Sequence, residues 1–434
     1  MIPLLHEVGQ SLGLIRPFVN LCQLLPPDKF YLVGGALRNA LLGKPVSDID
    51  LASSCDPTQI AKEFASSNGG HWFWLDESRL QSRVVFKTPM LLTFDFAPFR
   101  AEDLIQDLAA RDFTINSMAL SLPDKLENSQ IIDPLNGIFD LKKQTLKMSG
   151  PVTFSSDPLR ILKGVRHAVE LNFKLDQPTS LSMARNAWKL RHMAVERIRQ
   201  EVWSILQSPF PAYGIKLLFS QGVGGQLWGN DFDTQHAALL EKLEQCHLSW
   251  EAFRKMAPIT KVWLEQEVQQ GLTRQGLLLF TLCFALIKPG FPISLSEDWR
   301  VSRNAQRRIT SLSMTLPGMS MSLDAVAPNL RAFYFWLQKH GLDPADSLLA
   351  ASVTTRKGRH CLIEKLLKWV PLVSEVVRKN INDLVTGEWI SRELDIVPGP
   401  DVGKALAVLR NAEIEGLVAN SHQAKSFLRA HYKE

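Results

Sequence analysis

The sequence lacks the cysteine pattern of a disulfide-bonded or zinc-binding protein. Its five cysteines, spread over 434 residues, form no CxxC pair and have no histidine at zinc-ligand spacing. Scattered thiols are typical of a reducing compartment, so we expect a cytoplasmic protein. The first residues show no basic region followed by an apolar core, and we therefore expect no secretory signal.

Long apolar runs are also missing. The most apolar stretch, residues 277–287, is far shorter than the roughly 20 residues that cross a bilayer, so we interpret it as a buried helix and expect no membrane association. An apolar share of 45% and a charged share of 21% are typical of a globular protein. The formal charge of +5 suits a polyanionic partner without requiring one, and no protein partner is implied.

The pattern along the chain changes near residue 155. Short β-type runs such as residues 31–33 and 83–86 occur before it, whereas helical spacing dominates after it, as in residues 157–171, 194–206 and 236–248. We therefore predict an α+β head, with a small mixed sheet and helices, followed by a long all-helical remainder. Turn signals divide the chain into four expected parts, residues 1–150, 151–210, 211–320 and 321–434.

Two glycines follow the first strand-like run. Residues 31–38 read YLVGGALR, in which Gly34 and Gly35 join an apolar strand to a predicted helix. Glycines let the backbone approach an anion, and the amides at a helix start favour negative charge, so the turn could hold a phosphate. A plain strand-turn-helix connection gives the same pattern.

Carboxylates come next along the chain. Asp48 and Asp50 are two residues apart in a strand-like segment, and such side chains point to the same face. Paired carboxylates repel unless a cation lies between them, and Mg²⁺ prefers carboxylates completed by water and phosphates. Asp95, inside an apolar strand, is the candidate third ligand, since a buried charge needs a partner or a metal. The alternatives are a solvated turn for the pair and a water-facing edge for Asp95.

Five segments in order resemble the class II tRNA nucleotidyltransferases, the bacterial CCA-adding and poly(A) polymerase family within the DNA polymerase β-like nucleotidyltransferases. The most specific is RDFTINSMA, residues 111–119. The others are residues 32–50, 133–141, 157–166 and 196–201. Weaker resemblance in residues 299–303 and 398–404 extends it over nearly the whole chain. The resemblance implies a catalytic head, then a neck, body and tail that grip tRNA.

The resemblance also implies a reaction. Two Mg²⁺ ions held by Asp48, Asp50 and Asp95 would bind CTP or ATP, and the 3′-hydroxyl of tRNA would displace pyrophosphate. Nucleotide contacts are implied for the following residues: Gly34, Gly35, Arg38, Arg111, Asp112, Asn116, Asp157, Arg160 and Arg166. Read without the family, Arg111 and Asp112 would form a surface ion pair.

Base selection in this family is made by protein side chains, and Asp157 and Arg160 resemble the residues for that role. Their i, i+3 spacing puts a carboxylate and a guanidinium on one helical face. Asp157 followed by Pro158 is also an ordinary helix start, and both interpretations can hold together.

Several positions depart from the family pattern. Ser156 replaces a common Glu, Asn39 a common Asp and Ala110 a common Arg. Losing the Glu is expected to loosen Arg160, and losing the Arg to weaken a phosphate or ribose contact. The family's phosphohydrolase feature, a His-Asp pair, does not occur in the chain, so we expect no hydrolase activity.

The segment before residue 111 is short. Only residues 101–110 separate Arg100 from Arg111, where many relatives have a longer flexible loop that helps the switch from CTP to ATP. This favours CC addition, ahead of A addition or complete CCA addition. The alternatives are an enzyme of the same fold that adds poly(A) to general RNA or modifies a small molecule, and a non-catalytic RNA-binding relative. Basic clusters at residues 303–308 and 356–359 are candidate tRNA contacts.

Overall fold

A computed structural model describes most of the chain. The described residues are 12, 15–87, 91–122, 130–229, 231–288, 290–316, 330–354, 364, 367–374 and 384–432. They fall into two units, one made of residues 1–194 and 217–230 and the other of residues 195–216 and 231–434. The expected four-part division stays a prediction.

A mixed sheet is the centre of the first unit. Its strands lie in the order β3-β4-β5-β2-β1-β6-β7. The strand bounds are β1 Phe30–Val33, β2 Asp48–Ser53, β3 His71–Asp76, β4 Gln81–Phe86, β5 Leu92–Pro98, β6 Ala119–Ser121 and β7 Ile131–Ile132. Strands β2 and β5 pair in parallel, whereas the other neighbours pair antiparallel. The parallel pair places the two predicted acidic strands side by side.

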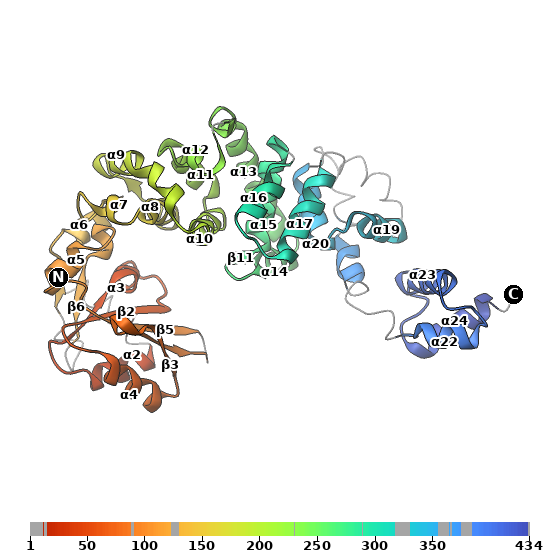
Figure 1. The fold of residues 1–434 in the computed structure, drawn as a ribbon, viewed down its shortest axis with the longest axis horizontal. Helices are drawn as coiled ribbons and strands as arrows, with labels where there is room; N and C mark the ends of the chain where they lie inside the picture. The colour runs from red at the N-terminus through yellow and green to blue at the C-terminus, as the bar shows by residue number, and fades with distance from the viewer. Residues whose placement is uncertain are drawn as a thin grey trace. The chain divides into compact units, whose positions relative to one another are not determined.

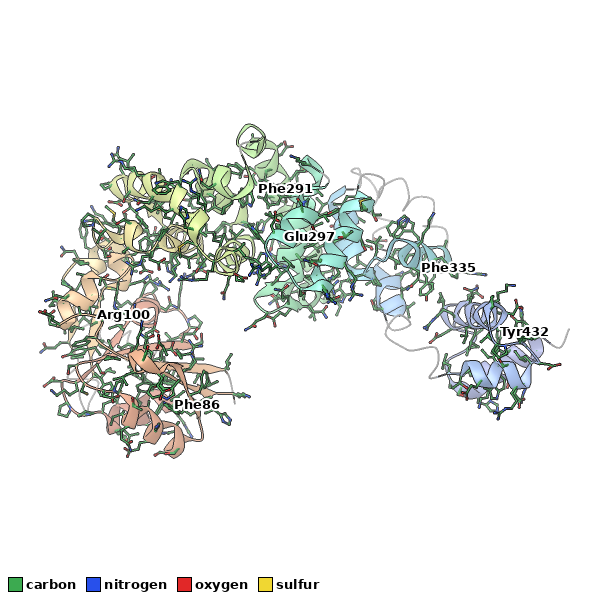
Figure 2. All side chains as sticks on the ribbon, viewed as in Figure 1. Phe86, Arg100, Phe291, Glu297, Phe335 and Tyr432 are labelled. Carbon is green, nitrogen blue, oxygen red and sulfur yellow. The ribbon has the colours of Figure 1, made fainter. Side chains whose placement is uncertain are left out.

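Helices cover the sheet because apolar side chains of the strands and of the helices pack against each other. Helix α4, Thr58–Asn68, packs on the strands through the buried ring of Phe64, whose centroid lies 5.4 Å from that of Phe86 and 5.0 Å from that of Phe94. Figure 1 shows α2, Arg16–Leu24, beside α4, with α3, Gly34–Leu41, on the opposite side of β2. Figure 2 labels Phe86 within this packed region.

The rest of the first unit is mainly helical. The predicted helix at residues 157–171 is present as α8, which begins at Leu159. The other elements are α5 Leu104–Ala109, η2 Thr114–Asn116, α6 Gly137–Lys142, α7 Thr153–Ser156, α9 Gln177–Asn186, η4 Ala187–His192, α12 Val223–Trp228 and the parallel strand pair β8 Thr145–Leu146 with β9 Lys174–Leu175.

The second unit confirms the helical prediction. Its helices are α10 Val195–Leu206, α13 Asp231–Met256, α14 Ile259–Glu265, α15 Arg274–Ile287, α16 Phe291–Asp298, α17 Arg303–Thr315, α19 Leu330–His340, α20 Pro344–Thr354, α22 Gly387–Glu393, α23 Pro400–Ile414 and α24 Ser421–Tyr432, and α11 Pro211–Ser220 begins there. A hairpin of β10, Glu267–Gln269, and β11, Leu272–Thr273, departs from the all-helical expectation. The apolar run at residues 277–287 is the buried part of α15, as predicted.

The expectations about the cysteines and about membrane-spanning segments can be compared with the described residues. Cys22, Cys55, Cys246 and Cys283 are free thiols, and Cys361 lies outside the described residues. Within the described ranges, no helix combines the length and the apolar character needed to cross a bilayer.

A buried ionic cluster joins three helices of the second unit. Asp346 of α20 is 1% exposed, accepts a hydrogen bond of 2.7 Å from Arg274 Nη1 of α15, and accepts one of 2.7 Å from Arg308 Nε of α17. Asp343 also accepts from Arg274. Arg308 was expected on a tRNA-binding surface, but it pairs with Asp346 and its side chain is only 14% exposed. Arg303 and Arg307 are exposed, and residues 356–359 lie outside the described part.

We predict that Asp346→Ala destabilises the second unit by about 3–5 kcal/mol, because the half-buried Arg308 loses its paired carboxylate and the buried Arg274 keeps only Asp343. Hydrogen exchange of α15, α17 and α20 in the full chain measures this loss. Asp401→Ala, which removes a well-exposed carboxylate paired with Lys404, is the matched control and should change exchange little. Equal protection in both variants would contradict the prediction.

Candidate active site

The glycine turn lies directly over the acidic strand. Gly34 begins α3 immediately after β1, with φ of +71°, and a Cβ atom there would stand 3.1 Å from Asp50 Oδ2. Only glycine adopts this left-handed conformation without strain, and only glycine leaves this space open. The turn therefore brings the start of α3 close to a carboxylate, as a phosphate site beside a metal site requires.

Strand alternation presents the two acids on one face. Ile49 is 1% exposed and points into the core, so Asp48 and Asp50 point away from it. Asp48 accepts a hydrogen bond of 3.1 Å from Ser47 Oγ and a second from Thr93 Oγ1. The pKa of Asp50 is raised first by burial and then by the charge of Asp95, which is its partner in the parallel β2–β5 register.

Cations surround this concentration of negative charge. The charges of Arg111 and Arg100 oppose the rise in the pKa of Asp50. Arg83 of β4 lies opposite Asp95 in the antiparallel register and donates from Nε at 2.6 Å and from Nη2 at 2.7 Å to the two carboxylate oxygens. The candidate third ligand is thus held in a bidentate ion pair, a partner that sequence reasoning missed.

The acids match a divalent cation only in part. Among the residues that the structure describes, no three His, Cys, Asp or Glu side chains gather in an arrangement that could hold a metal ion. Asp48 and Asp50 offer the oxygen ligands that Mg²⁺ prefers, and burial together with the charge of Asp95 raises the pKa of Asp50. Asp95 could join them only by releasing an oxygen from Arg83.

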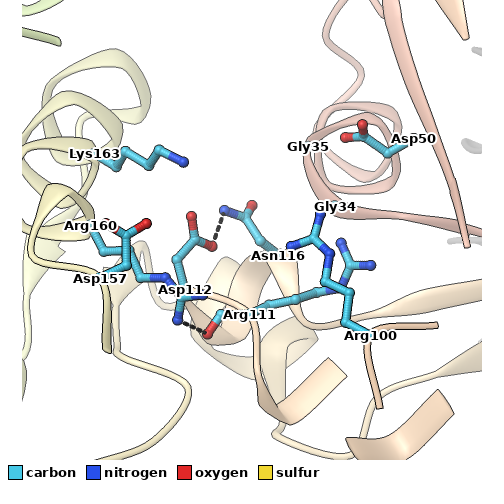
Figure 3. Close-up of a pocket in the computed structure, with 10 residues that line it drawn as sticks. All are labelled: Gly34, Gly35, Asp50, Arg100, Arg111, Asp112, Asn116, Asp157, Arg160 and Lys163. Atoms are coloured by element: carbon cyan, nitrogen blue, oxygen red, sulfur yellow. Dashed lines mark hydrogen bonds between the residues drawn. The ribbon is translucent and has the colours of Figure 1, made fainter. Parts of the chain in front are cut away.

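A polar pocket opens beside the glycine turn, with about 200 Å³ of space. Its lining, drawn in Figure 3, consists of Gly34, Gly35, Asp50, Arg100, Arg111, Asp112, Asn116, Asp157, Arg160 and Lys163. Seven of the nine residues expected to contact a nucleotide line this pocket, as does Asp50. Asp157, Arg160 and Lys163 line the pocket from α8 and its start, and the other lining residues come from the sheet region. Such a pocket could bind a triphosphate on one side and a base on the other.

The side chains of the RDFTINSMA segment are fixed by hydrogen bonds. Arg111 pairs with Asp107, from Nη2 to Oδ2 at 2.8 Å, instead of with the adjacent Asp112. Asp112 Oδ1 accepts a bond of 3.0 Å from Asn116 Nδ2. The surface Arg111–Asp112 ion pair that we considered does not form; the charged partner of Arg111 is buried on α5.

Arg38 and Arg166 lie behind the pocket. Arg38 is 7% exposed and donates from Nη1 to Asn116 Oδ1 at 2.7 Å, while its other nitrogens reach Asn39 Oδ1. Arg166 pairs with Glu170 at 3.0 Å. Asn39, which replaces a common Asp, therefore still accepts from Arg38. In this structure Arg38 positions Asn116 and does not itself line the pocket.

The two predicted base-reading residues are held by backbone groups. Asp157 Oδ1 accepts from the Leu159 amide at 3.1 Å, so the helix-capping interpretation is correct for this carboxylate. Arg160 donates from Nη1 to the Arg111 carbonyl at 3.1 Å and from Nη2 to the Ala110 carbonyl at 2.9 Å. Two backbone carbonyls thus hold Arg160 in this structure, and the expected loosening through the loss of a Glu at Ser156 stays a prediction.

Two cationic residues of the pocket were missed from the sequence. Lys163 lies three residues after Arg160 on α8, and the i, i+3 spacing that linked Asp157 to Arg160 was the available signal. Arg100 follows β5 and had no such signal. A second pocket of about 130 Å³ adds Asp95, Gln81 and Pro98 to Asp50, Arg100 and Arg111, so Asp50 lies where the two pockets meet.

Two family profiles match the chain. One, described as "Poly A polymerase head domain", matches residues 30–147, and the other, described as "Probable RNA and SrmB- binding site of polymerase A", matches residues 172–227. The first profile covers the mixed sheet and most residues of the pocket lined by glycines, carboxylates and cations. Together, these features place the chain in the class of nucleotidyltransferases.

Relatives that match nearly the full length of the chain define its family more closely. The chain is 30% identical over 405 residues to a CC-adding tRNA nucleotidyltransferase from Geobacter sulfurreducens, covering 92% of this chain and 91% of the relative. It is 26% identical to a CCA-adding enzyme from Streptococcus thermophilus, covering 91% and 90%. The chain belongs to the family of CC-adding and CCA-adding tRNA nucleotidyltransferases, and it is an enzyme.

Solved structures share the fold. A Thermotoga maritima CCA-adding enzyme complexed with tRNA has a TM-score of 0.66 at 21% identity, covering 99% of this chain and 98% of that chain. A CCA-adding enzyme complexed with CTP has a TM-score of 0.68 at 21% identity, covering 99% of both. The predicted α+β head followed by helices is confirmed.

A buried histidine behind the pocket makes stability depend on pH. Burial, reinforced by Arg166, lowers the pKa of His167 to about 4, and the pKa of Glu170 is lowered to about 2, where burial is outweighed by His167 and Arg166. Between the unfolded pKa of His, about 6.5, and pH 4, the unfolded chain binds the extra proton, so stability falls as pH falls.

We predict that the free energy of unfolding falls by about 3 kcal/mol over this range because of His167, and that Glu170 adds to the loss below about pH 4.5. His167→Gln should flatten the dependence above pH 4.5. Hydrogen exchange of α8, corrected for the intrinsic effect of pH, measures the slope. The exposed His71→Gln is the control, and a His167→Gln slope equal to that of the wild type would refute the prediction.

Proposed function

We propose that this enzyme adds two cytidylates from CTP to the 3′ end of tRNA and stops before the terminal adenylate. The observation that carries the proposal is α5. The ten residues between Arg100 and Arg111 contain a capped helix whose residues Leu104 and Leu108 pack into a core cluster with Val33. Many relatives have a longer flexible loop in this place, which helps the switch from CTP to ATP, so a short ordered helix favours addition of C alone, although a short segment also occurs with complete CCA addition.

The relatives support the same choice. Two CC-adding tRNA nucleotidyltransferases, from Geobacter sulfurreducens and Synechocystis, are 30% and 29% identical to the chain over 92% and 93% of its length. Addition of A, complete CCA addition and poly(A) addition are outcomes that the assay below distinguishes. We propose the cytoplasm as the location of this activity.

The nucleotide would lie in the first pocket. Its triphosphate would rest on the amides of Gly34 and Gly35 and on Arg111, because backbone donors and a guanidinium fork suit phosphate oxygens. Asn116 and Asp112, which are bonded to each other, would contact the ribose. The base would face α8, where Asp157 and Arg160 offer an acceptor and donors, and Lys163 adds a positive charge.

The catalytic carboxylates we propose are Asp48, Asp50 and Asp95. Asp48 and Asp50 would hold Mg²⁺, and Asp95 would join them after Arg83 gives up one carboxylate oxygen. The bound cations would neutralise triphosphate charge and lower the pKa of the tRNA 3′-hydroxyl. Arg100 and Arg111 contribute to the same charge balance. Arg38, by bonding Asn116, and Arg166, by pairing with Glu170, would hold the walls of the site.

The tRNA end would enter through the second pocket, which meets the nucleotide pocket at Asp50 and contains Asp95. We propose residues 1–150 as the catalytic head, residues 151–210 as the neck that reads the base, and residues 211–320 and 321–434 as the body and tail that bind tRNA. The exposed Arg303 and Arg307 remain candidate phosphate contacts in the body.

We predict that tRNA lacking CCA gains two C residues, whereas tRNA ending in CC gains nothing from ATP. Purified enzyme, Mg²⁺ and each tRNA with CTP or ATP give a product ladder at single-nucleotide resolution. A ladder with a terminal A would reject the CC-only proposal, and a long A tail on general RNA would indicate a poly(A) polymerase.

We expect Asp48→Ala to reduce CTP addition about a thousandfold, since several kcal/mol of transition-state stabilisation depend on this carboxylate. Single-turnover extension of tRNA lacking CCA measures the rate. Glu63→Ala, at an exposed position of α4 outside both pockets, should retain wild-type activity. Similar rates in wild type and Asp48→Ala would sink the proposed metal site.

A further inference from the structure

The head sheet exposes large apolar side chains on strand β3, at one end of the strand order. Phe73 is 43% exposed and Leu75 is 47% exposed, whereas Trp72 and Trp74, which alternate with them, are half-buried. Because side chains alternate along a strand, the exposed pair points away from the face that α4 covers. Exposed apolar side chains that gather on one face, rimmed by polar groups, are typical of a binding surface.

The inner face of β3 holds the strand in place. The ring centroids of Trp72 and Trp74 lie 5.0 Å apart in an edge-to-face arrangement, and Lys62 Nζ of α4 lies 4.6 Å from the centroid of Trp72. Aromatic and cation–π contacts of this kind stabilise the packing of the strand on the helix. Phe73 and Leu75 therefore project from a strand that is anchored through its opposite face.

Strand register connects this edge of the sheet with the proposed catalytic carboxylates. Paired residues of neighbouring strands point to the same face, and one row of pairs crosses the sheet from Phe73 of β3 to Arg83 of β4, Asp95 of β5 and Asp50 of β2. Neighbouring strands are ~4.8 Å apart, so the backbone at Phe73 lies about 10 Å from that at Asp95. Leu75 itself lines the second pocket together with Asp50 and Asp95. A molecule bound on the exposed pair would thus lie within one or two nucleotides of the acids.

A cation lies between the ring and the carboxylates. The side chain of Arg83 is 35% exposed, and its ion pair with Asp95 uses Nε and Nη2. A guanidinium has five N–H donors, so three of them are not used by that pair. An aromatic ring on which a base can stack, beside a positive charge for the backbone, is the combination found in sites for single-stranded nucleic acid.

We infer that Phe73, with Leu75 beside it, is the stacking platform for the acceptor end of the tRNA: one of its last two bases lies on Phe73 while its 3′-hydroxyl lies at Asp95. The inference rests on the proposed function, in which the triphosphate occupies the first pocket and the acceptor strand enters the second. Stacking on an aromatic ring tolerates any base, because every base has a π-face. The same platform can therefore hold an acceptor end whose last base changes after each addition.

The test combines variants of the protein with variants of the RNA. Phe73→Ala removes the ring, and Phe73→Trp keeps an aromatic surface. Phe139→Ala, which removes an exposed ring of α6 in the same unit, is the matched control, since Phe139 is not among the residues that line either pocket. The substrates are tRNA lacking CCA and two forms of it in which the last or the penultimate nucleotide has no base but keeps its ribose.

The measurements are kcat/KM for each RNA at saturating CTP, CTP affinity by calorimetry, and thermal unfolding to show that the variants fold. We expect Phe73→Ala to lower kcat/KM for intact tRNA about tenfold or more, the size of one base–aromatic stack, with CTP affinity unchanged. One of the two base-free RNAs should show a similar loss with the wild type and little further loss with Phe73→Ala, because both changes remove the same contact. Phe73→Trp should restore the rate, and Phe139→Ala should match the wild type.

Three results would overturn the inference: wild-type kinetics in Phe73→Ala, losses from Phe73→Ala and from base removal that multiply for both base-free RNAs, or a loss that comes with weakened CTP binding. If the face instead holds a second copy of the chain, light scattering would show a dimer that dissociates in Phe73→Ala, and the losses would multiply. Failure of the proposed function is distinct, because the wild type would then extend no tRNA. A wild type that adds C, with Phe73→Ala behaving alike, rejects only the platform.

Discussion

The parallel pairing of β2 with β5 is the constraint on which the site depends. It places Asp50 beside Asp95 in register, with Asp48 two residues away on the same face, so negative charge gathers at a partly buried point. Such a cluster persists only if cations balance it. Arg83 pairs with Asp95, and the charges of Arg100 and Arg111 act on Asp50. The substrate phosphates and metals that we propose would enter a site already organised by this charge balance.

A series of neighbouring residues extends from this charge cluster to α8, the helix that we propose reads the base. Arg111 lies in the pocket with Asp50, Asp107 holds Arg111, and the helix that contains Asp107 ends on the carbonyls that hold Arg160. The Arg111–Asp107 ion pair and the bonds from Arg160 involve buried or half-buried side chains, where a lost partner is costly. The contacts around α5 therefore join the two sides of the pocket that we propose for the triphosphate and the base.

Local patterns predicted the parts of the site that are local in sequence. The i, i+2 alternation placed Asp48 and Asp50 on one face, and the two glycines before a helix placed the turn over them. Arg83 was not predictable, because its pairing with Asp95 follows from strand register and not from spacing. The partner of Arg111 was misjudged for a similar reason, since the i, i+4 pair with Asp107 exists only once residues 104–109 are helical.

Longer-range packing explains the remaining differences. Arg308 looked like part of a basic surface, but Asp346, thirty-eight residues further along the chain, pairs with it in the body of the second unit. Arg38 looked like a phosphate ligand, but Asn116, seventy-eight residues away, accepts its guanidinium. In both cases the sequence suggests that an arginine is free to bind a phosphate, whereas in the folded protein its guanidinium donates to a residue that is distant in the sequence.

The ordered helix at residues 104–109 has an implication for how a protein can select nucleotides without a template. A reader that accepts two different bases in turn needs two orientations of its donors, and each orientation must be reachable without breaking the surrounding packing. Here the donors of Arg160 are bonded to a helix whose leucines lie in the core cluster and whose acid is buried. A new orientation of Arg160 would break its charge-assisted hydrogen bonds to the carbonyls of Ala110 and Arg111, because the helix before these carbonyls is packed in the core. If Arg160 reads the base, as we propose, a single orientation of its donors would favour a single nucleotide.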